Sequence, residues 1–438
     1  MKKLTLFPLL FFAGLALNGV EKIPLSKAIE NGLQTSFQLK NQLLEEEAAQ
    51  IGTTSAAMKM LFNIDFSGSY LYKSQQMEIT LPGISPAPAG VSGPGQTIVA
   101  GSKHNVDLKL ALTQPLFSGG ILSQSLKKER FNVQSEKYLT ELKKIDIAGQ
   151  IKTAYLNFRL LTEKRRSHEL LLEEMTLHLK KIELLVREEL AKKTDLLETE
   201  ATCAEARLGL LDLDVAMTAE ELRFQRLTGF DAAAIEDDYR EPELPAAEAG
   251  SRFRSGHPLL KALDEKRHML QAQRRIVSGT YLPQLNGFAE LHYGRPGIDF
   301  FKNEWSFYFQ GGVALYLPVF NWNRMRHDLE LVDLAARKLE NQRDDFIAET
   351  ERNLQSLLFS RDKIKNKLAT LDELIGLAEE ELRIKERLYL ENQIAHTDFL
   401  AAVTGRERYR SQKQESLTQL QLLNAAINAA CGQSVEDK

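Results

Sequence analysis

The sequence predicts a mixed α/β membrane protein in which four transmembrane β-strands per chain are joined to long α-helices. Three observations lead to this fold class: an internal repeat, two pairs of alternating strands, and two long stretches without proline. Charged residues make up 26% of the chain, which excludes a polytopic helical membrane protein, because that class needs several apolar runs of about 20 residues. The net charge of −4 leaves no basic surplus for nucleic acid as a partner.

The chain contains two copies of one unit. Pro115-Leu116-Phe117 recurs as Pro318-Val319-Phe320, and Thr194-Asp195-Leu196-Leu197 recurs as Thr397-Asp398-Phe399-Leu400, in both cases 203 residues later. A register kept over such a length indicates an internal repeat. We therefore divide the chain into a first repeat (residues 19–230), a linker (231–256), a second repeat (257–432) and a C-terminal tail (433–438).

The first 18 residues have the layout of a signal peptide. Met1-Lys2-Lys3 is positively charged, and the apolar run from Leu4 to Leu17 follows it. At about 14 residues this run is too short to span a bilayer comfortably. We therefore expect export from the cytoplasm.

Each repeat is predicted to contain a helix, two strands separated by a loop, a long helix and a further helix. In the first repeat the helix covers Leu25–Leu61, and Gln75–Gly101, rich in proline, glycine and serine, is the loop. The strands are recognised by apolar residues of period two. These are Phe62, Ile64, Phe66, Tyr70 and Tyr72; Val106, Leu108, Leu110 and Leu112; Leu285, Leu291 and Tyr293; and Trp305, Phe307, Phe309, Val313 and Leu315.

The long helices are predicted over Ile121–Leu190 and Arg324–Glu391, which contain no proline. Each would extend on the order of 100 Å, so it must pack along neighbours as a coiled coil or helical barrel. The strand-to-helix junctions are marked by Pro115 and Pro318. Gly119 and Gly120 are interpreted as a backbone bend that redirects the chain from strand to helix.

Four strands cannot close a barrel in a membrane, because open edges leave backbone groups without partners in lipid. Two copies would give eight strands and a filled tube, whereas three copies would give twelve strands around a lumen. The alternation predicts that Leu110 and Val313 face lipid. Lys109 and Gly312 then face the lumen, where arginine should disturb assembly less.

These features resemble the TolC-type outer membrane efflux protein family. The resemblance rests on the two-fold repeat, the junction Gln114-Pro115-Leu116-Phe117-Ser118-Gly119-Gly120, its partner Leu317-Pro318-Val319-Phe320, and the two Thr-Asp helix starts. It implies a homotrimer with a 12-stranded outer membrane β-barrel and a periplasmic α-helical barrel. It also implies a passive duct for small molecules or proteins, in an efflux or type I secretion system, with a periplasmic adaptor protein and an inner membrane transporter as partners.

The resemblance also implies a gate at the helix starts. Asp398 corresponds to an acidic ring that narrows the closed tunnel, and Thr194, Asp195 and Tyr389 correspond to residues that bind neighbouring helices shut. This chain departs from the pattern where Ile394 replaces an arginine, Ala401 replaces a second ring acid, and Glu189 and Asn392 replace turn glycines. We therefore expect a gate held by fewer polar links. Independently of the family, the two Thr-Asp pairs are typical of helix capping.

No catalytic residue, metal site or cofactor is predicted. The eight histidines show no spacing that would place two ligands on one helix face, and two cysteines, Cys203 and Cys431, are too few for a thiolate metal site. Ser125 and Lys128 fit an S-x-x-K pattern, but they lie in a charged helix without companion motifs. The alternative function is a soluble periplasmic coiled-coil scaffold, which would have no reason to keep one strand face apolar.

Overall fold

The computed structural model describes residues 22–83, 93–236, 239–299, 301–391 and 393–433. The predicted signal peptide (residues 1–18) and Asn392 lie outside these ranges. The chain forms two compact units. Unit 1 comprises the described residues up to Gln42, Thr140–Pro258 and the described residues from Phe346, and unit 2 comprises Leu43–Leu139 and Leu259–Asp345. Each sequence repeat thus contributes to both units.

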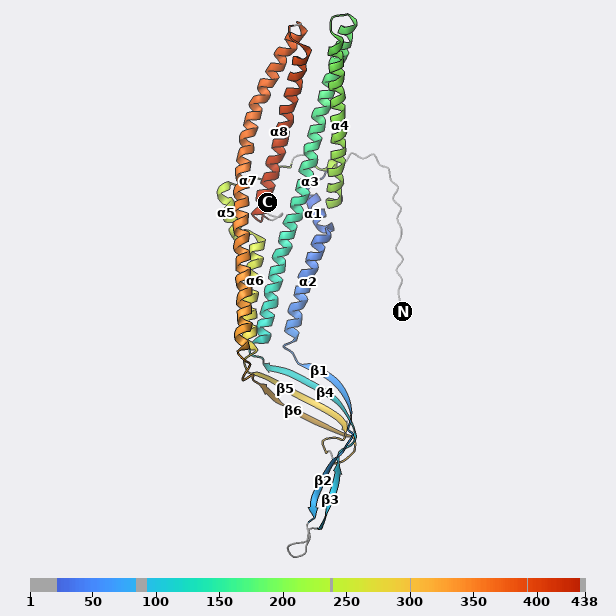
Figure 1. Ribbon diagram of the computed structural model, residues 1–438, viewed down its shortest axis with the longest axis vertical. Helices are drawn as coiled ribbons and strands as arrows, with labels where there is room; N and C mark the ends of the chain where they lie inside the picture. The colour runs from blue at the N-terminus through green and yellow to red at the C-terminus, as the bar shows by residue number, and fades with distance from the viewer. Residues whose placement is uncertain (1–21, 84–92, 237–238, 300, 392, 434–438) are drawn as a thin grey trace, which may run out of the picture. The chain divides into compact units, whose positions relative to one another are not determined.

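Unit 2 contains a four-stranded antiparallel sheet in the order β1-β4-β5-β6 (Figure 1). The strands are β1 (Asn63–Tyr72), β4 (His104–Phe117), β5 (Gln284–Arg295) and β6 (Ser306–Tyr316). The four predicted strands are therefore confirmed, and their 10 to 14 residues suffice to cross an outer membrane at a tilt. Pairing of β4 with β5 joins the two repeats in one sheet.

The expectation that Gln75–Gly101 is a loop throughout is wrong. Strands β2 (Met77–Gly83) and β3 (Gly93–Ala100) form a separate antiparallel hairpin, and residues 84–92 between them lie outside the described ranges. Thr80 of β2 lies directly opposite Thr97 of β3, and their hydroxyl oxygens are 3.4 Å apart. Such cross-strand pairs stabilise strands at the two ends of a segment whose glycine and proline content suggested a loop.

The helices are α1 (Leu25–Thr35), α2 (Phe37–Met58), α3 (Ile121–Arg187), α4 (Lys193–Thr228), α5 (Ala246–Gly256), α6 (Pro258–Gly279), α7 (Arg324–Leu390) and α8 (His396–Ala430), with a short 3₁₀ helix η1 (Ala232–Ala234). Helices α3 and α7 each have 67 residues, which confirms the long helical stretches. The single helix expected over Leu25–Leu61 is instead broken at Ser36. The Ser36 backbone leaves the helical region, and its Oγ accepts a hydrogen bond from the Leu39 N–H at 3.4 Å, which starts α2.

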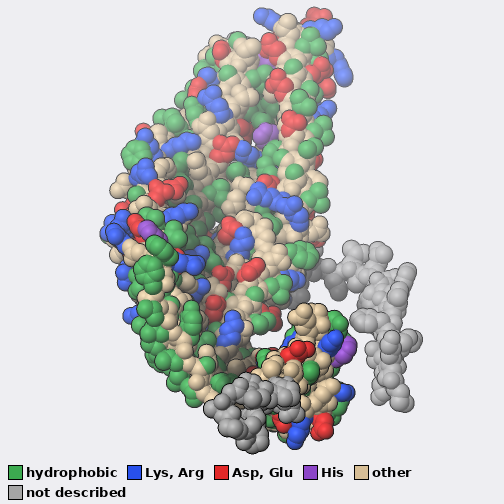
Figure 2. Space-filling view, turned by 60° about the horizontal axis from the view of Figure 1, so that its bottom comes forward, with side chains coloured by type: hydrophobic (Ala, Val, Ile, Leu, Met, Phe, Trp, Pro, Cys, Tyr) green, Lys and Arg blue, Asp and Glu red, His purple; other side chains and the backbone are tan. Residues whose placement is uncertain are grey.

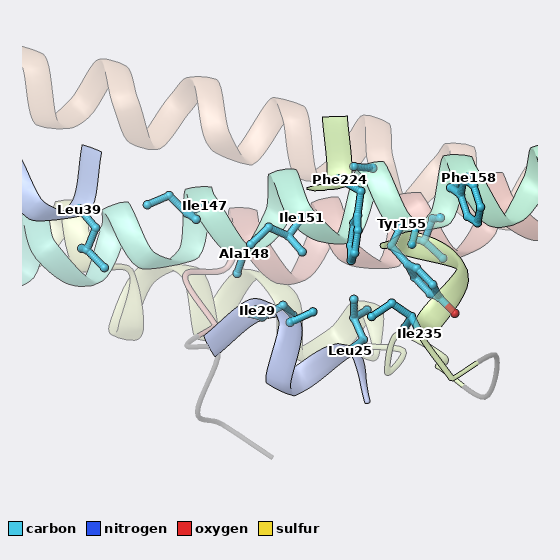
Figure 3. Close-up of a cluster of buried hydrophobic side chains, with 14 residues drawn as sticks. Leu25, Ile29, Leu39, Ile147, Ala148, Ile151, Tyr155, Phe158, Phe224 and Ile235 are labelled. Atoms are coloured by element: carbon cyan, nitrogen blue, oxygen red, sulfur yellow. The ribbon is translucent and has the colours of Figure 1, made fainter. Parts of the chain in front are cut away.

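The core of unit 1 lies where α1 packs on α3 and α4 (Figure 3). Ile151 and Tyr155 recur on one face of α3 at helical spacing and meet Leu25 and Ile29 of α1 and Phe224 of α4. All five side chains are buried. This packing fixes the N-terminal helix against the long helices.

The segment between the repeats is held to unit 1 by a buried carboxylate. Glu241 has a side chain only 2% exposed, and it accepts from Lys152 Nζ at 2.9 Å and from Asn428 Nδ2 at 2.8 Å. The Tyr239 hydroxyl also donates to it, and burial together with this bond raises the pKa of Tyr239. Because a buried charge is tolerated only when paired and hydrogen-bonded, these partners fix the segment to α3 and α8.

Acidic and basic side chains are interspersed rather than gathered by sign on the face shown in Figure 2. Charged side chains also pair between neighbouring helices, such as Arg406 of α8 with Glu174 of α3 at 2.6 Å and Arg165 of α3 with Asp214 of α4 at 2.7 Å. The Arg165–Asp214 pair is exposed, and such pairs contribute little stability individually.

Candidate functional site

The sheet has one apolar and one polar face, as the alternation predicted. Leu110 lies level with Phe66 of β1, Leu291 of β5 and, through β5, Phe309 of β6. These side chains are 37 to 72% exposed in the single chain. An apolar surface that crosses four strands is unfavourable in water and requires an apolar partner, which a lipid bilayer supplies.

The opposite face is polar. Lys109, the neighbour of Leu110, pairs with Glu290 of β5 at 3.1 Å. Gly312 also lies on this face, but a Cβ there would be 3.1 Å from the ring of Phe288. A side chain at Gly312 therefore requires the Phe288 ring to shift, so Lys109 is the better of the two polar-face positions at which to test an arginine.

The strand-to-helix junctions repeat the same backbone geometry in both copies. Gly119 (φ 59°) and Gly120 (φ 82°) separate β4 from α3, and the equivalent Trp322 (φ 51°) and Asn323 (φ 62°) precede α7. Left-handed backbone at two successive positions turns the chain sharply, at no steric cost for glycine and at a cost of roughly 1–2 kcal/mol for other residues. The bend inferred at Gly119-Gly120 is therefore present, and the second copy makes it without glycine.

The two prolines of the junctions have different environments. Pro115 lies within β4 where the pairing with β5 shifts register, beyond the last β1 pair at Asn63↔Thr113. A residue without an N–H is tolerated at such a bulge, because no ladder bond is lost. Pro318 follows the end of β6 in irregular backbone.

A short connection joins α3 to α4, and another joins α7 to α8. The predicted gate residues lie beside these connections, close to the first residues of α4 and α8 or the last residues of α7. The expectation that the threonines cap the helices is wrong. The capping positions are Lys192 and Ala395, neither of which makes a side-chain bond, and Thr194 instead donates to Asp195 Oδ1 at 3.3 Å. The helices start earlier than the sequence suggested, so threonine falls inside the first turn. Asp195 and Asp398 do lie in that turn, where a carboxylate complements the helix dipole.

Tyr389 is half-buried between the two helix pairs. Its ring stacks on Phe399 with centroids 5.4 Å apart and borders an apolar cluster. Burial, and secondarily the charge of Asp195, raise the pKa of Tyr389 to about 12, so its hydroxyl stays protonated at physiological pH. The structure thus brings Asp195 within electrostatic range of Tyr389, and Thr194 bonds to Asp195. Asp398 is exposed, and its side chain has no hydrogen-bond or ion-pair partner among the described residues.

Sequence reasoning missed a pair of buried histidines beside Tyr389. The rings of His178 in α3 and His396 in α8 are nearly parallel, with centroids 5.2 Å apart. Thr199 donates to the Asp195 carbonyl, so His396 Nε2 must donate to Thr199 Oγ1 at 2.8 Å. Burial lowers the pKa of His178 to about 4 and lowers that of His396, so both rings are neutral at pH 7. No local spacing could reveal this pair, because the two residues belong to different helices.

The departures from the family pattern have structural counterparts. Glu189 has φ 58°, the left-handed conformation for which a glycine is suited. Ile394 packs against the apolar cluster beside Tyr389. An apolar side chain at this position therefore adds to the packing of the helix ends instead of adding a polar link.

The remaining candidate sites have ordinary structural surroundings. Lys128 of the S-x-x-K pattern donates to Gln273 at 3.1 Å. Cys203 and Cys431 are buried free thiols, and burial raises the pKa of each. Within the described ranges, no three histidine, cysteine, aspartate or glutamate side chains are grouped so that they could hold a metal ion. None of the helices in those ranges combines the length and apolar character needed to cross a bilayer.

Comparison with known proteins agrees with this architecture. The model of the outer membrane efflux protein family matches residues 28–230 and 250–433. No curated protein sequence matches the chain. The solved outer membrane protein VceC of Vibrio cholerae has a TM-score of 0.75 at 16% identity, over 94% of this chain and 97% of its own. The Campylobacter jejuni CmeC outer membrane channel has a TM-score of 0.73 at 12% identity, over 100% and 96%.

A sheet with one lipid-compatible face, joined to long helices, defines an outer membrane channel that extends into the periplasm. The chain belongs to the outer membrane efflux protein family, and its fold is the TolC-type fold that its motifs resemble. It is an efflux channel and not an enzyme. The alternative of a soluble scaffold is not supported, since it leaves the apolar sheet face unexplained.

Proposed function

We propose that three copies of this chain form a passive export duct across the outer membrane. The observation that carries this proposal is the open sheet, whose outer strands β1 and β6 each pair on one side only. All ten residues of β1 are exposed. In lipid these edges need partners, and β1 of one copy pairing with β6 of the next would close twelve strands around a lumen.

The long helices support continuation of this duct into the periplasm. Helices α3 and α7 leave the strands β4 and β6, and each returns through α4 or α8. We propose that their far ends dock to a periplasmic adaptor protein, which connects the channel to an inner membrane transporter. The cargo would be small molecules or proteins delivered by that transporter.

The assembly is tested by detergent extraction of outer membranes followed by cross-linking and native mass measurement. A cross-linked species of three chains, recovered with the outer membrane, is the expected result. Recovery of a soluble monomer from the periplasm would contradict the proposal.

We further propose that the helix starts form the gate. Asp398 is exposed in the first turn of α8, and three-fold symmetry would place three such carboxylates around the tunnel axis. With Ala401 one turn later, these carboxylates would supply most of the negative field at the entrance, which favours cations. Tyr389 is half-buried, and the charge of Asp195 contributes to its raised pKa. We propose that Tyr389 holds the helix pairs closed.

Single-channel recordings in planar bilayers separate these two roles. Asp398→Ala should reduce cation selectivity and abolish block by multivalent cations while trimers still form, and Asp195→Ala should raise the open probability. Glu205→Ala is the matched control, because it removes an exposed carboxylate of α4 away from the turn. Unchanged selectivity in Asp398→Ala would place the constriction elsewhere.

A further inference from the structure

The polar face of the sheet carries a histidine between two carboxylates. His292 of β5 has a side chain only 8% exposed. Its Nδ1 lies 3.1 Å from both carboxylate oxygens of Asp107 on β4, and its Nε2 lies 3.4 Å from Glu290 Oε2. The ring stacks on Tyr308 of β6, with centroids 4.6 Å apart and planes at 2°. Neighbours on three strands therefore fix the imidazole in one orientation.

Both protonation states of His292 have hydrogen-bond partners in this arrangement. When the ring is neutral, Nδ1–H can donate to Asp107, and Nε2 can accept from the Gln310 amide at 3.3 Å. When the ring is protonated, Nε2–H can donate to Glu290, while Gln310 keeps its bond to Glu290 at 2.5 Å. The proton can therefore be gained or lost without leaving a buried polar atom unpaired, so the sheet is kept intact.

The charged groups around His292 come from β4 and β5. Lys109 pairs with Glu290, so this cluster has a formal charge of −1 when His292 is neutral and zero when it is protonated. On β1, Ser67 and Ser69 occupy the adjoining positions, and Asp65 accepts from Asn63 at 2.7 Å. On β6 the neighbours are the uncharged Tyr308 and Gln310.

We propose that His292, Asp107 and Glu290 form a pH-dependent charge filter on the lumen wall of the barrel. The filter favours cationic solutes when His292 is neutral and loses this preference when His292 is protonated. This inference rests on the proposed trimeric barrel, in which the polar face lines the lumen and three copies change the wall charge from −3 to zero. Imidazole is the side chain suited to such a change between pH 5 and 8.

The local charge can be measured independently of the gate with a thiol on the polar face. Ser67→Cys places an exposed thiol level with Lys109, which is itself level with His292. Cationic and anionic methanethiosulfonate reagents, added from outside to purified trimers in liposomes, then report the charge as the ratio of their reaction rates. The ratio cancels the pH dependence of the thiol itself. The native cysteines are buried, and the protein without Ser67→Cys serves as the blank.

The cationic-to-anionic rate ratio should fall about fourfold from pH 8 to pH 5.5. Loss of the negative charge slows the cationic reagent and speeds the anionic reagent, so both changes lower the ratio. His292→Gln should remove this pH dependence. His104→Gln is the matched control and should retain it, because His104 lies on the apolar face beside Tyr70. If His292→Gln fails to assemble, Asp107→Asn provides the test, since its ratio at pH 8 should equal the unsubstituted ratio at pH 5.5.

The outcomes separate the filter from the barrel. A thiol that reacts at a ratio independent of pH, or a pH dependence that persists in His292→Gln, overturns the charge filter while the barrel stands. A thiol that reacts with neither reagent in an assembled trimer overturns the lumen position of this face, and with it both proposals.

Discussion

Replacing Gly119 by alanine tests whether the bend between β4 and α3 depends on a close backbone approach. A Cβ at Gly119 would lie 2.4 Å from the carbonyl oxygen of Gly279, at the end of α6. At Gly279, a Cβ would lie 2.7 Å from the carbonyl oxygen of Gly119. The two glycines therefore allow the junction and α6 to touch backbone to backbone. Gly120 also has a positive φ, but a Cβ there would meet no atom within 4 Å.

This contrast separates backbone strain from steric overlap. Both Gly119→Ala and Gly120→Ala put a side chain on a left-handed residue, at a cost of roughly 1–2 kcal/mol. Only Gly119→Ala also forces the backbone of α6 to move, and overpacking of this kind costs about 1–3 kcal/mol. We therefore expect a loss of about 2–5 kcal/mol for Gly119→Ala and about 1–2 kcal/mol for Gly120→Ala. Gly279→Ala combines the overlap with a helix-propensity gain of up to about 1 kcal/mol, so its loss should be about 0–3 kcal/mol.

The free energies are obtained from guanidinium unfolding in detergent, followed by the fluorescence of the two tryptophans, of which Trp322 lies at the equivalent junction before α7. The double variant Gly119→Ala/Gly279→Ala should lose less than the sum of the single losses, because one displacement relieves both overlaps. Equal losses for Gly119→Ala and Gly120→Ala would refute the close-approach argument and leave backbone strain as the whole effect.

Three further predictions concern the sheet face, the segment between the repeats and pH. Leu110→Arg should destabilise the assembled channel by roughly 2–4 kcal/mol near the bilayer midplane. Lys109→Arg is the control, because it keeps its positive charge on the polar face and should leave the trimer yield high. Equal trimer yields for the two variants would show that the faces are misassigned. Lys152→Ala should cost about 3–5 kcal/mol in guanidinium unfolding, because it leaves Glu241 charged and buried without its ion pair, and a loss below 1 kcal/mol would contradict this. Burial lowers the pKa of His257 to about 4, so the unfolded chain binds this proton first as the pH falls. Stability should therefore decrease from about pH 6.5 to pH 4, and His257→Phe should reduce that decrease by about 1–2 kcal/mol; an unchanged decrease would exclude His257 as a cause.

Periodicity in the sequence was sufficient for the four strands of the main sheet and for the two long helices. In β4 and β6 each residue of the apolar face is followed by one of the polar face, so the two faces can be read from the residue order. The same local reasoning was wrong where tertiary packing selects among similar local states. The β2–β3 hairpin is stabilised by cross-strand pairs within a segment whose composition suggested a loop, and α1 and α2 separate at Ser36, a residue that local propensity tolerates inside a helix.

The sequence by itself determined the repeat, the two faces of the sheet and the extent of the two long helices. The repeat can be read directly from the residue order, and the other two features depend on residues close together in the chain. Only the tertiary structure decided which distant groups meet. The contact of Gly119 with Gly279, the stacking of His178 on His396 and the position of His292 between Asp107 and Glu290 each join separate elements. Such contacts depend on the crossing of helices and the register of strands, and neither is encoded in local spacing.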